Sequence, residues 1–194
     1  MKFNKRILSA GIILWAIAIA IGTIWVTDYV SRPGRSAIAP VNLELTSPTA
    51  AVNLPKLLVF LHPHCPCSCA TLAGLSRLNA RNTGLVDVSV FFYQPSDQSR
   101  EWVETDLWHR VSVIPNLSVA AITEAEIQKF GAITSGQTLL YDTRQQIVFS
   151  GGITGGRGHE GDNAGLESIE RFLRTGETAV SQTPVFGCIL TATE

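Results

Sequence analysis

The longest uninterrupted apolar run of the chain lies near its start, at residues 7–26, ILSAGIILWAIAIAIGTIWV. A helix of that length, with a rise of about 1.5 Å per residue, spans about 30 Å, the thickness of a bilayer's hydrocarbon core. Lys2, Lys5 and Arg6 precede the run, which favours a cytoplasmic N-terminus. We therefore predict a single-pass anchor over residues 1–30, in the inner (cytoplasmic) membrane, with the rest of the chain facing the periplasm or another extracytoplasmic space.

A cleaved signal peptide is the alternative for the same run. The sequence Ala37-Ile38-Ala39 has the small-x-small form of a cleavage site. Pro40 follows it and is unfavourable there, and the apolar run is long for a signal peptide. A retained anchor is the prediction that we carry forward.

The region after the anchor divides into three parts by composition. Residues 31–55 contain four prolines among Ser, Thr and Ala, which is typical of a partly extended linker. Residues 56–176 alternate between strand-like and helix-like patterns and predict one domain. Residues 177–194 form a polar tail that carries Cys188 near its end.

Within the domain, Val- and Phe-rich runs predict strands, and apolar residues at spacings of three and four predict helices. The predicted strands are 56–61, 85–93, 114–121, 137–142 and 146–152, and the predicted helices are 66–79, 96–111, 123–131 and 165–176. The first half is a strand–helix–strand unit with a parallel pair, and the second half is a hairpin followed by a helix. This order predicts an α/β sheet covered on both faces.

Charge excludes one class of partner. The first 35 residues hold five of the 15 basic residues and one of the 16 acidic ones, so the remainder carries a net charge of −5. Nucleic-acid binding needs a basic surface to neutralise phosphates. We therefore predict no nucleic-acid partner.

The chemistry of the chain is concentrated where the first predicted strand meets the first helix of the domain, in the sequence LHPHCPCSCA. The first turn of a helix presents unpaired N–H groups and a partial positive charge, which lower the pKa of a thiol placed there. Cys65 is the predicted nucleophile, with Cys67 or Cys69 as the thiol that resolves a mixed disulfide. Each of these residues also has an inert interpretation as a small buried side chain, and for Cys69 the structural role is favoured.

Three further cysteine and histidine positions are candidates, and two of them, Cys188 and His62, have two interpretations each. Cys188 is either a free thiol or a resolving partner that folds back onto the cluster. His64 is expected to support the thiolate by its charge. His62, at the end of the strand, either joins the site or satisfies local backbone groups.

The motifs resemble the thioredoxin superfamily. A strand ends in HCPC where that family has its Cys-x-x-Cys, and residues 130–152 are similar to the family's later strand region. HPHCPC, SGGITGGRGHEGDNAG and PVFGC also resemble a group of membrane-anchored bacterial thioredoxin-like proteins, the RedB-like proteins. The resemblance implies a thioredoxin-like three-layer α/β/α sandwich and thiol–disulfide exchange.

Two positions depart from the family pattern. The thiols have Cys-x-Cys and Cys-x-x-x-Cys spacings, so Cys65 pairs either with Cys67 in a tight ring or with Cys69 across one helical turn. Gly136 occupies the place where the resemblance implies a cis-proline beside the active site. Glycine does not hold a cis bond as proline does, which puts the family's mode of substrate docking in doubt.

Three functions remain open. The first is an oxidoreductase that acts on thiols or disulfides of exported proteins without a cofactor. The second is a copper-delivery module, since soft thiolates select Cu(I). Cys65 and Cys69 at Cys-x-x-x-Cys spacing, with a distant His159, resemble the copper-delivery proteins of the same superfamily, which implies copper at these three residues. The third is a domain that only binds partners. The glycine-rich loop 151–163 is either an anion-binding nest or a plain connection, and its His159 and Asp162 are candidate site residues.

Overall fold

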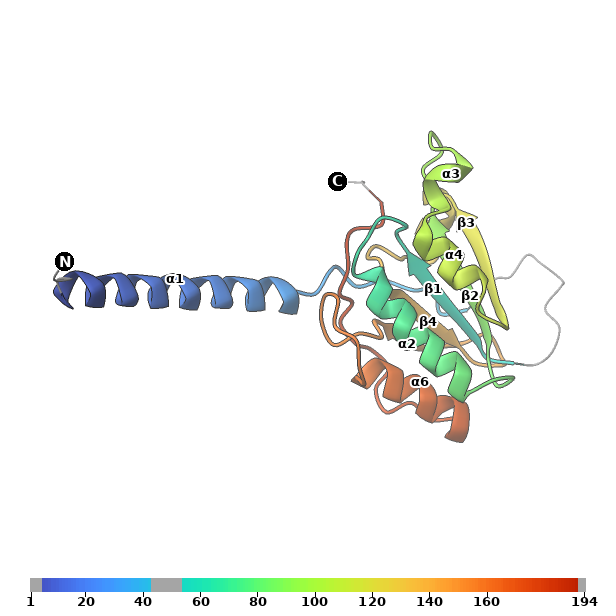
Figure 1. Ribbon diagram of the computed structural model, residues 1–194. Coiled ribbons are helices and arrows are strands. Elements are labelled where there is room, and N and C mark those ends of the chain that lie inside the picture. Colours follow the sequence, from blue (N-terminus) through green and yellow to red (C-terminus); the bar gives the residue numbers. More distant parts are fainter. Residues whose placement is uncertain (1–4, 43–53, 192–194) are drawn as a thin grey trace.

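The computed structural model describes residues 5–42 and 54–191. A five-stranded sheet lies at its centre in the order β3-β2-β1-β4-β5 (Figure 1). The strands are β1 Lys56–Leu61, β2 Asp87–Tyr93, β3 Leu117–Ile122, β4 Gln137–Tyr141 and β5 Ile147–Gly151. β1, β2 and β3 run parallel, β4 runs antiparallel to β1, and β5 runs antiparallel to β4.

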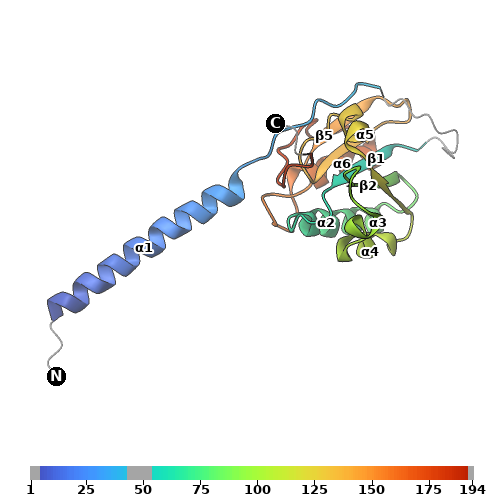
Figure 2. The ribbon, with the colours of Figure 1, turned by 90° about the horizontal axis from the view of Figure 1, so that it is seen from above.

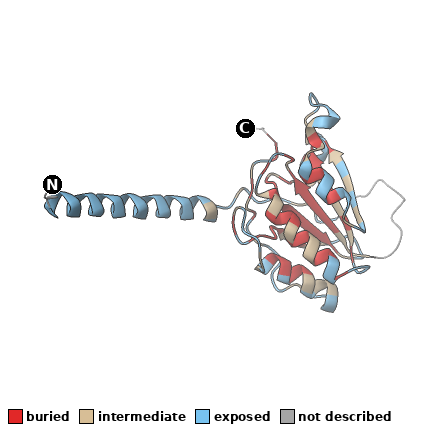
Figure 3. Cartoon of the chain, in the orientation of Figure 1, coloured by how far each residue is buried: buried red, intermediate tan, exposed pale blue. Residues whose placement is uncertain are grey.

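One face of the sheet is covered by helices of the domain. These are α2 Ser68–Arg81, α4 Asp106–Ser112 and α6 Ala164–Thr175, with the short α3 Arg100–Val103 beside them. The inward side chains of β1 are fully buried against the leucines of α2 and against Ile169 of α6. Figure 3 shows the same division, with the buried sides of α2 and α6 turned to the sheet.

The other face of the sheet has a thinner cover. Ile127 of α5, which spans Glu124–Lys129, packs there with Phe60, Leu139 and Tyr141. Leu190 and Ala39, from opposite ends of the chain, join this second core. The predicted α/β sheet with both faces covered is confirmed.

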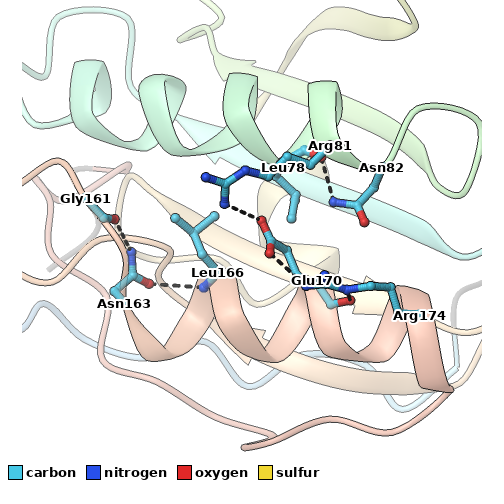
Figure 4. A network of polar contacts seen from close by, with 8 residues as sticks. All are labelled: Leu78, Arg81, Asn82, Gly161, Asn163, Leu166, Glu170 and Arg174. Atoms are coloured by element: carbon cyan, nitrogen blue, oxygen red, sulfur yellow. Dashed lines mark hydrogen bonds and ion pairs between the residues drawn. The ribbon is translucent and has the colours of Figure 1, made fainter.

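Helix boundaries follow from local capping. The side chain of Asn163 accepts hydrogen bonds from the backbone N–H groups of Gly165 and Leu166 and so begins α6. Gly176 ends it with a φ of +79°. Arg81 at the end of α2 forms an ion pair with Glu170 of α6, which links the two neighbouring helices (Figure 4).

The predicted single helix over 96–111 is wrong, since two short helices occupy it. Thr105 has an extended conformation, with φ −77° and ψ 174°, and begins α4 as its N-cap. Its hydroxyl donates to the carbonyl of Pro63 at 3.3 Å. The interruption between α3 and α4 at Thr105 is therefore hydrogen-bonded to the turn that carries the cysteines.

The described part of the linker is packed onto the domain. Gly34 N–H donates to Val185 O at 2.7 Å, and Tyr141 Oη donates to Pro40 O at 3.1 Å. Asn42 forms an isolated bridge with Gln146. Residues 43–53 of the predicted linker lie outside the described residues. Residues 34–42 are therefore a strap across the sheet rather than a free tether.

The N-terminal helix α1 spans Lys5–Ser31 and projects away from the domain (Figures 1 and 2). It has 27 residues and a mean hydropathy of 2.4, and none of its apolar window is buried in the protein. It is long and apolar enough to cross a membrane.

Candidate active site

The candidate site begins at the corner between β1 and α2. Cys65 N–H donates to His62 O at 3.1 Å, and Cys65 O accepts from Ser68 N–H at 3.0 Å. These two turns place Cys65 three residues before the helix, which starts at Ser68, with Cys67 as its N-cap, rather than at the predicted residue 66. The side chain of Cys65 is almost fully buried, with 3% of the residue exposed.

Cys188 lies directly against Cys65. Their Sγ atoms are 2.9 Å apart, although 123 residues separate them along the chain. Both thiols are free. The separation exceeds the about 2.05 Å of a disulfide bond, but a small side-chain movement would close it.

The C-terminal segment, residues 184–190, holds Cys188 in place. Cys188 O accepts from Ser135 N–H at 2.8 Å, and Leu190 N–H donates to Ile133 O at 2.8 Å. Gly187 packs so tightly that a Cβ there would lie 1.9 Å from Ser135 O. This segment therefore forms a short antiparallel pairing with the loop that precedes β4.

The pKa values of the two thiols move in opposite directions. Burial alone would raise the pKa of Cys65, but hydrogen bonds from the Cys188 thiol, from the backbone N–H groups of Cys188 and Cys67, and from Ser68 outweigh it and lower the pKa. Burial, together with the hydrogen bond and the negative charge of Cys65, raises the pKa of Cys188 to about 12. Of the two thiols, Cys65 is therefore the one that ionises first, and the Cys188 thiol donates a hydrogen bond to its thiolate.

Cys67 is the third thiol of the cluster. Burial and the charge of Cys65 raise its pKa, whereas the positive charge of Arg157 and a hydrogen bond from it act in the opposite direction. The Nη1 of Arg157 also donates to Gly187 O at 2.6 Å. One guanidinium thus contacts both the Cys67 side chain and the backbone next to Cys188.

Cys69 lies in a different environment. Its Sγ accepts from Nη1 of Arg110 at 3.9 Å, and its side chain packs against the core beneath α2. The groups that set the pKa of Cys65 come from Cys188, Cys67 and Ser68. The structure therefore brings together Cys65, Cys67 and Cys188, and it directs Cys69 toward α4.

The two histidines pack beside the thiol cluster. The His64 ring lies 4.5 Å from the Trp102 ring, and its Nε2 is 3.0 Å from Trp102 O. His62 N–H donates to Ser135 Oγ at 2.8 Å, and its Nδ1 accepts from His64 N–H at 3.1 Å. Burial and the charge of His64 lower the pKa of His62, which favours its neutral form. Both rings thus order the turn that carries Cys65.

Gly136 lies beside the C-terminal segment. Its φ is +92°, a conformation that proline cannot adopt, and its N–H donates to Phe60 O at 2.8 Å. A Cβ there would lie 3.0 Å from Thr71 Oγ1 and 3.9 Å from Phe186 O. At the position where the resemblance implies a proline, the backbone of Gly136 therefore lies close to the backbone of Phe60 in β1 and of Phe186 in the C-terminal segment.

The glycine-rich loop supplies Arg157 to the site, and its other candidates lie apart from the thiols. His159 and Asp162 are exposed, and Asp162 lies at the start of α6. Among residues 5–42 and 54–191, no group of three or more His, Cys, Asp or Glu side chains is arranged to hold a metal ion. The copper alternative stays a prediction.

The fold is identified by its strand order and by the position of the cysteines. Three parallel strands are followed by an antiparallel hairpin, and the thiols lie at the end of the central strand. The domain has a thioredoxin-like fold. In this thioredoxin-like domain the C-terminal segment is packed over Cys65.

Comparisons with known proteins agree with the fold. No protein-family model matches the chain, and no curated protein matches it. An uncharacterized conserved protein from Geobacillus kaustophilus is 17% identical, with a TM-score of 0.61, over 84% of this chain and 93% of that one. A hypothetical protein from Sinorhizobium meliloti is 16% identical, with a TM-score of 0.55, over 84% and 99% of the two chains. These identities bear on the fold alone.

Sequence reasoning missed three residues of the site. Ser135 Oγ contacts Ser68 Oγ at 2.9 Å, and together with the His62 backbone it links β1, α2 and the loop before β4. Arg157 is the third. The glycines of its loop were recognised in the sequence, but nothing in the sequence predicted that the Arg157 side chain would contact the thiols.

Proposed function

We propose that this protein is a membrane-anchored thiol–disulfide oxidoreductase in which Cys65 is the nucleophile and Cys188 the resolving thiol. The observation that carries the proposal is the 2.9 Å approach of the two sulfurs at the start of a helix. The lowered pKa of Cys65 and the raised pKa of Cys188 assign the roles. The proposed substrates are thiols or disulfides of proteins outside the cytoplasm.

The exchange proceeds in two balanced steps. The Cys65 thiolate attacks a substrate disulfide, forms a mixed disulfide, and one substrate thiolate leaves and takes up a proton. Cys188 then loses its proton, and its thiolate attacks Cys65 Sγ. The second substrate thiolate leaves, so the substrate is reduced to a dithiol and the protein is oxidised to a Cys65–Cys188 disulfide. The reverse reaction runs through the same mixed disulfide.

The roles of the two thiols change during the reaction. The negative charge of Cys65 contributes to the raised pKa of Cys188. That charge disappears when Cys65 enters the mixed disulfide, so the pKa of Cys188 falls at the step in which it must act. The Arg157 charge, which opposes the rise in the pKa values of both Cys67 and Cys188, remains.

The test is a single turnover by the pre-reduced full chain in nanodiscs, with insulin disulfides as substrate and the two protein thiols as the source of electrons. Cys65→Ser should abolish the reduction. Cys188→Ser should stop turnover and accumulate a mixed disulfide at Cys65. Cys69→Ser is the matched control and should stay within about twofold of the wild type, since Cys69 faces Arg110.

Two outcomes would contradict the proposal. Full activity in Cys188→Ser, with a mixed disulfide trapped in Cys67→Ser, would transfer the resolving role to Cys67. Tight Cu(I) binding by the wild type without any exchange would favour the copper alternative.

A further inference from the structure

The end of the anchor helix is attached to the thiol site through Arg157. Its backbone N–H donates to Val30 O at 3.0 Å, in the last turn of α1. Its guanidinium carbon lies 5.3 Å from the centre of the Tyr29 ring. The same guanidinium donates to Gly187 O, one residue from Cys188. A single side chain therefore bridges the helix end and the thiol cluster.

The residues immediately after α1 reinforce this attachment. Gly34 N–H donates to Val185 O at 2.7 Å, within the C-terminal segment. Arg35 O accepts a hydrogen bond from Thr134 Oγ1 at 2.8 Å. The next residue, Ser135, donates its N–H to Cys188 O. The chain thus leaves the helix and is immediately fixed to the elements that hold the resolving thiol.

These contacts define which end of the domain is near the membrane. The thiols lie at the carboxyl end of β1, and Figures 1 and 2 show α1 leaving the domain on the side where α2 begins. Lys56 at the other end of β1 pairs with Tyr141, so the β4–β5 turn lies at the opposite end of the sheet. A six-residue strand spans about 20 Å, which separates the two ends.

The distance from the apolar run to the site is short. The run ends at Val26, and four residues of helix to Val30 rise by about 6 Å. Tyr29 and Trp25 are the residue types that lie at membrane interfaces, and both are exposed. Ile189, next to Cys188, is 62% exposed. An exposed apolar side chain therefore lies next to Cys188 in the sequence.

We propose that the redox site faces the bilayer surface and that its partner is a cysteine pair of a membrane-embedded protein, held at the level of the lipid headgroups. This inference rests on the proposed function and narrows its partner. A freely diffusing exported protein would have to reach the thiols from the membrane side of the domain, where α1 and the surrounding lipids lie. A membrane-embedded partner reaches the same thiols by lateral diffusion.

The orientation can be tested without the native thiols. In the full chain with all four cysteines replaced by serine, Gly155→Cys places a reporter in the loop of Arg157, and Thr143→Cys places one in the β4–β5 turn. Both positions are exposed. Each variant is reconstituted in liposomes that contain a phosphatidylethanolamine with a 2-pyridyl disulfide on its headgroup. The thiolate attacks that disulfide and releases pyridine-2-thione, which is followed by absorbance.

Each lipid rate is divided by the rate with a soluble pyridyl disulfide. The inference predicts a ratio at least tenfold higher for Gly155→Cys than for Thr143→Cys. Equal ratios, or a higher ratio at Thr143→Cys, would overturn it.

A second measurement keeps the native thiols. A flexible spacer of glycine and serine inserted after Ser31 should lower the rate of wild-type thiols with the lipid probe at least fivefold, because it lowers their effective concentration at the surface. The rate with the soluble probe should not change. An unchanged lipid rate would contradict the orientation, whereas slow reaction with both probes before any insertion would instead contradict the proposed function.

Discussion

Cys65, Cys67 and Cys188 share one site but differ in which sulfur carries the charge. Hydrogen bonds converge on Cys65 from two backbone N–H groups, a hydroxyl and a thiol. Cys67 and Cys188 are each destabilised as thiolates by burial and by the charge on Cys65. When the cluster loses one proton, the negative charge therefore resides on Cys65, in the turn that leads into α2.

The pH dependence of Cys65 alkylation tests this assignment. Its rate should rise with pH through a midpoint below that of an ordinary cysteine, because only the thiolate reacts. Cys188→Ala removes a hydrogen-bond donor to the thiolate and should shift the midpoint to higher pH. Cys188→Ser retains a donor and should shift it less. The measurement is mass-spectrometric quantification of the Cys65 peptide after brief iodoacetamide treatment at each pH.

The contrary result is an unchanged midpoint in Cys188→Ala. It would mean that the Cys188 thiol gives the Cys65 thiolate no hydrogen bond in solution.

At the scale of elements, local pattern predicted most of the fold. Every expected strand is present, and β3 lies at the sheet edge. Local capping also marks the helix predicted over 123–131: Thr123 and Glu126 close a capping box at α5, and Gly131 follows that helix with a φ of +63°. Hydrophobic periodicity and capping residues act over a few positions, so one sequence displays them.

Contacts between distant segments could not be predicted in the same way. The pairing of the C-terminal segment with Ile133 and Ser135 involves backbone groups that any sequence possesses. Its one visible signal was Cys188, for which pairing with the cluster was one of two interpretations. The docking of Arg157 on Val30 also joins segments more than 100 residues apart. Such contacts depend on the assembled sheet, which no local pattern describes.

The fit of the C-terminal segment predicts the effect of one methyl group. Gly187→Ala would place a Cβ 1.9 Å from Ser135 O, so the segment must move and carry Cys188 away from Cys65. We expect a loss of about 1–3 kcal/mol in the free energy of unfolding, as for an overpacked core, and at least a fivefold lower yield of the Cys65–Cys188 disulfide. Denaturant unfolding and peptide mapping measure the two effects.

Gly155→Ala is the matched control. No atom lies within 4 Å of a Cβ at that position, so stability and disulfide yield should both match the wild type. If Gly187→Ala behaves like this control, the packing of the segment against Ser135 does not hold Cys188 in place.

At the scale of the whole molecule, both ends of the described chain converge on the thiol end of the sheet. The N-terminal helix α1 is attached there through Arg157, the strap of residues 34–42 crosses the second face, and Leu190 completes the core beneath it. The end of α1 and Cys188 are thus parts of one packed unit. This arrangement suits a redox site confined to a membrane surface, where tethering raises the effective concentration of a partner.

The most direct test of the account is the disulfide that forms when the full chain is mildly oxidised in its membrane. The protein is alkylated, digested without reduction, and its linked peptides are identified by mass spectrometry. The account predicts that the peptide containing Cys65 is joined to the peptide containing Cys188 as the dominant product, with Cys69 alkylated. A dominant bridge within the cluster at residues 65–69, with Cys188 recovered as a free alkylated thiol, would contradict it.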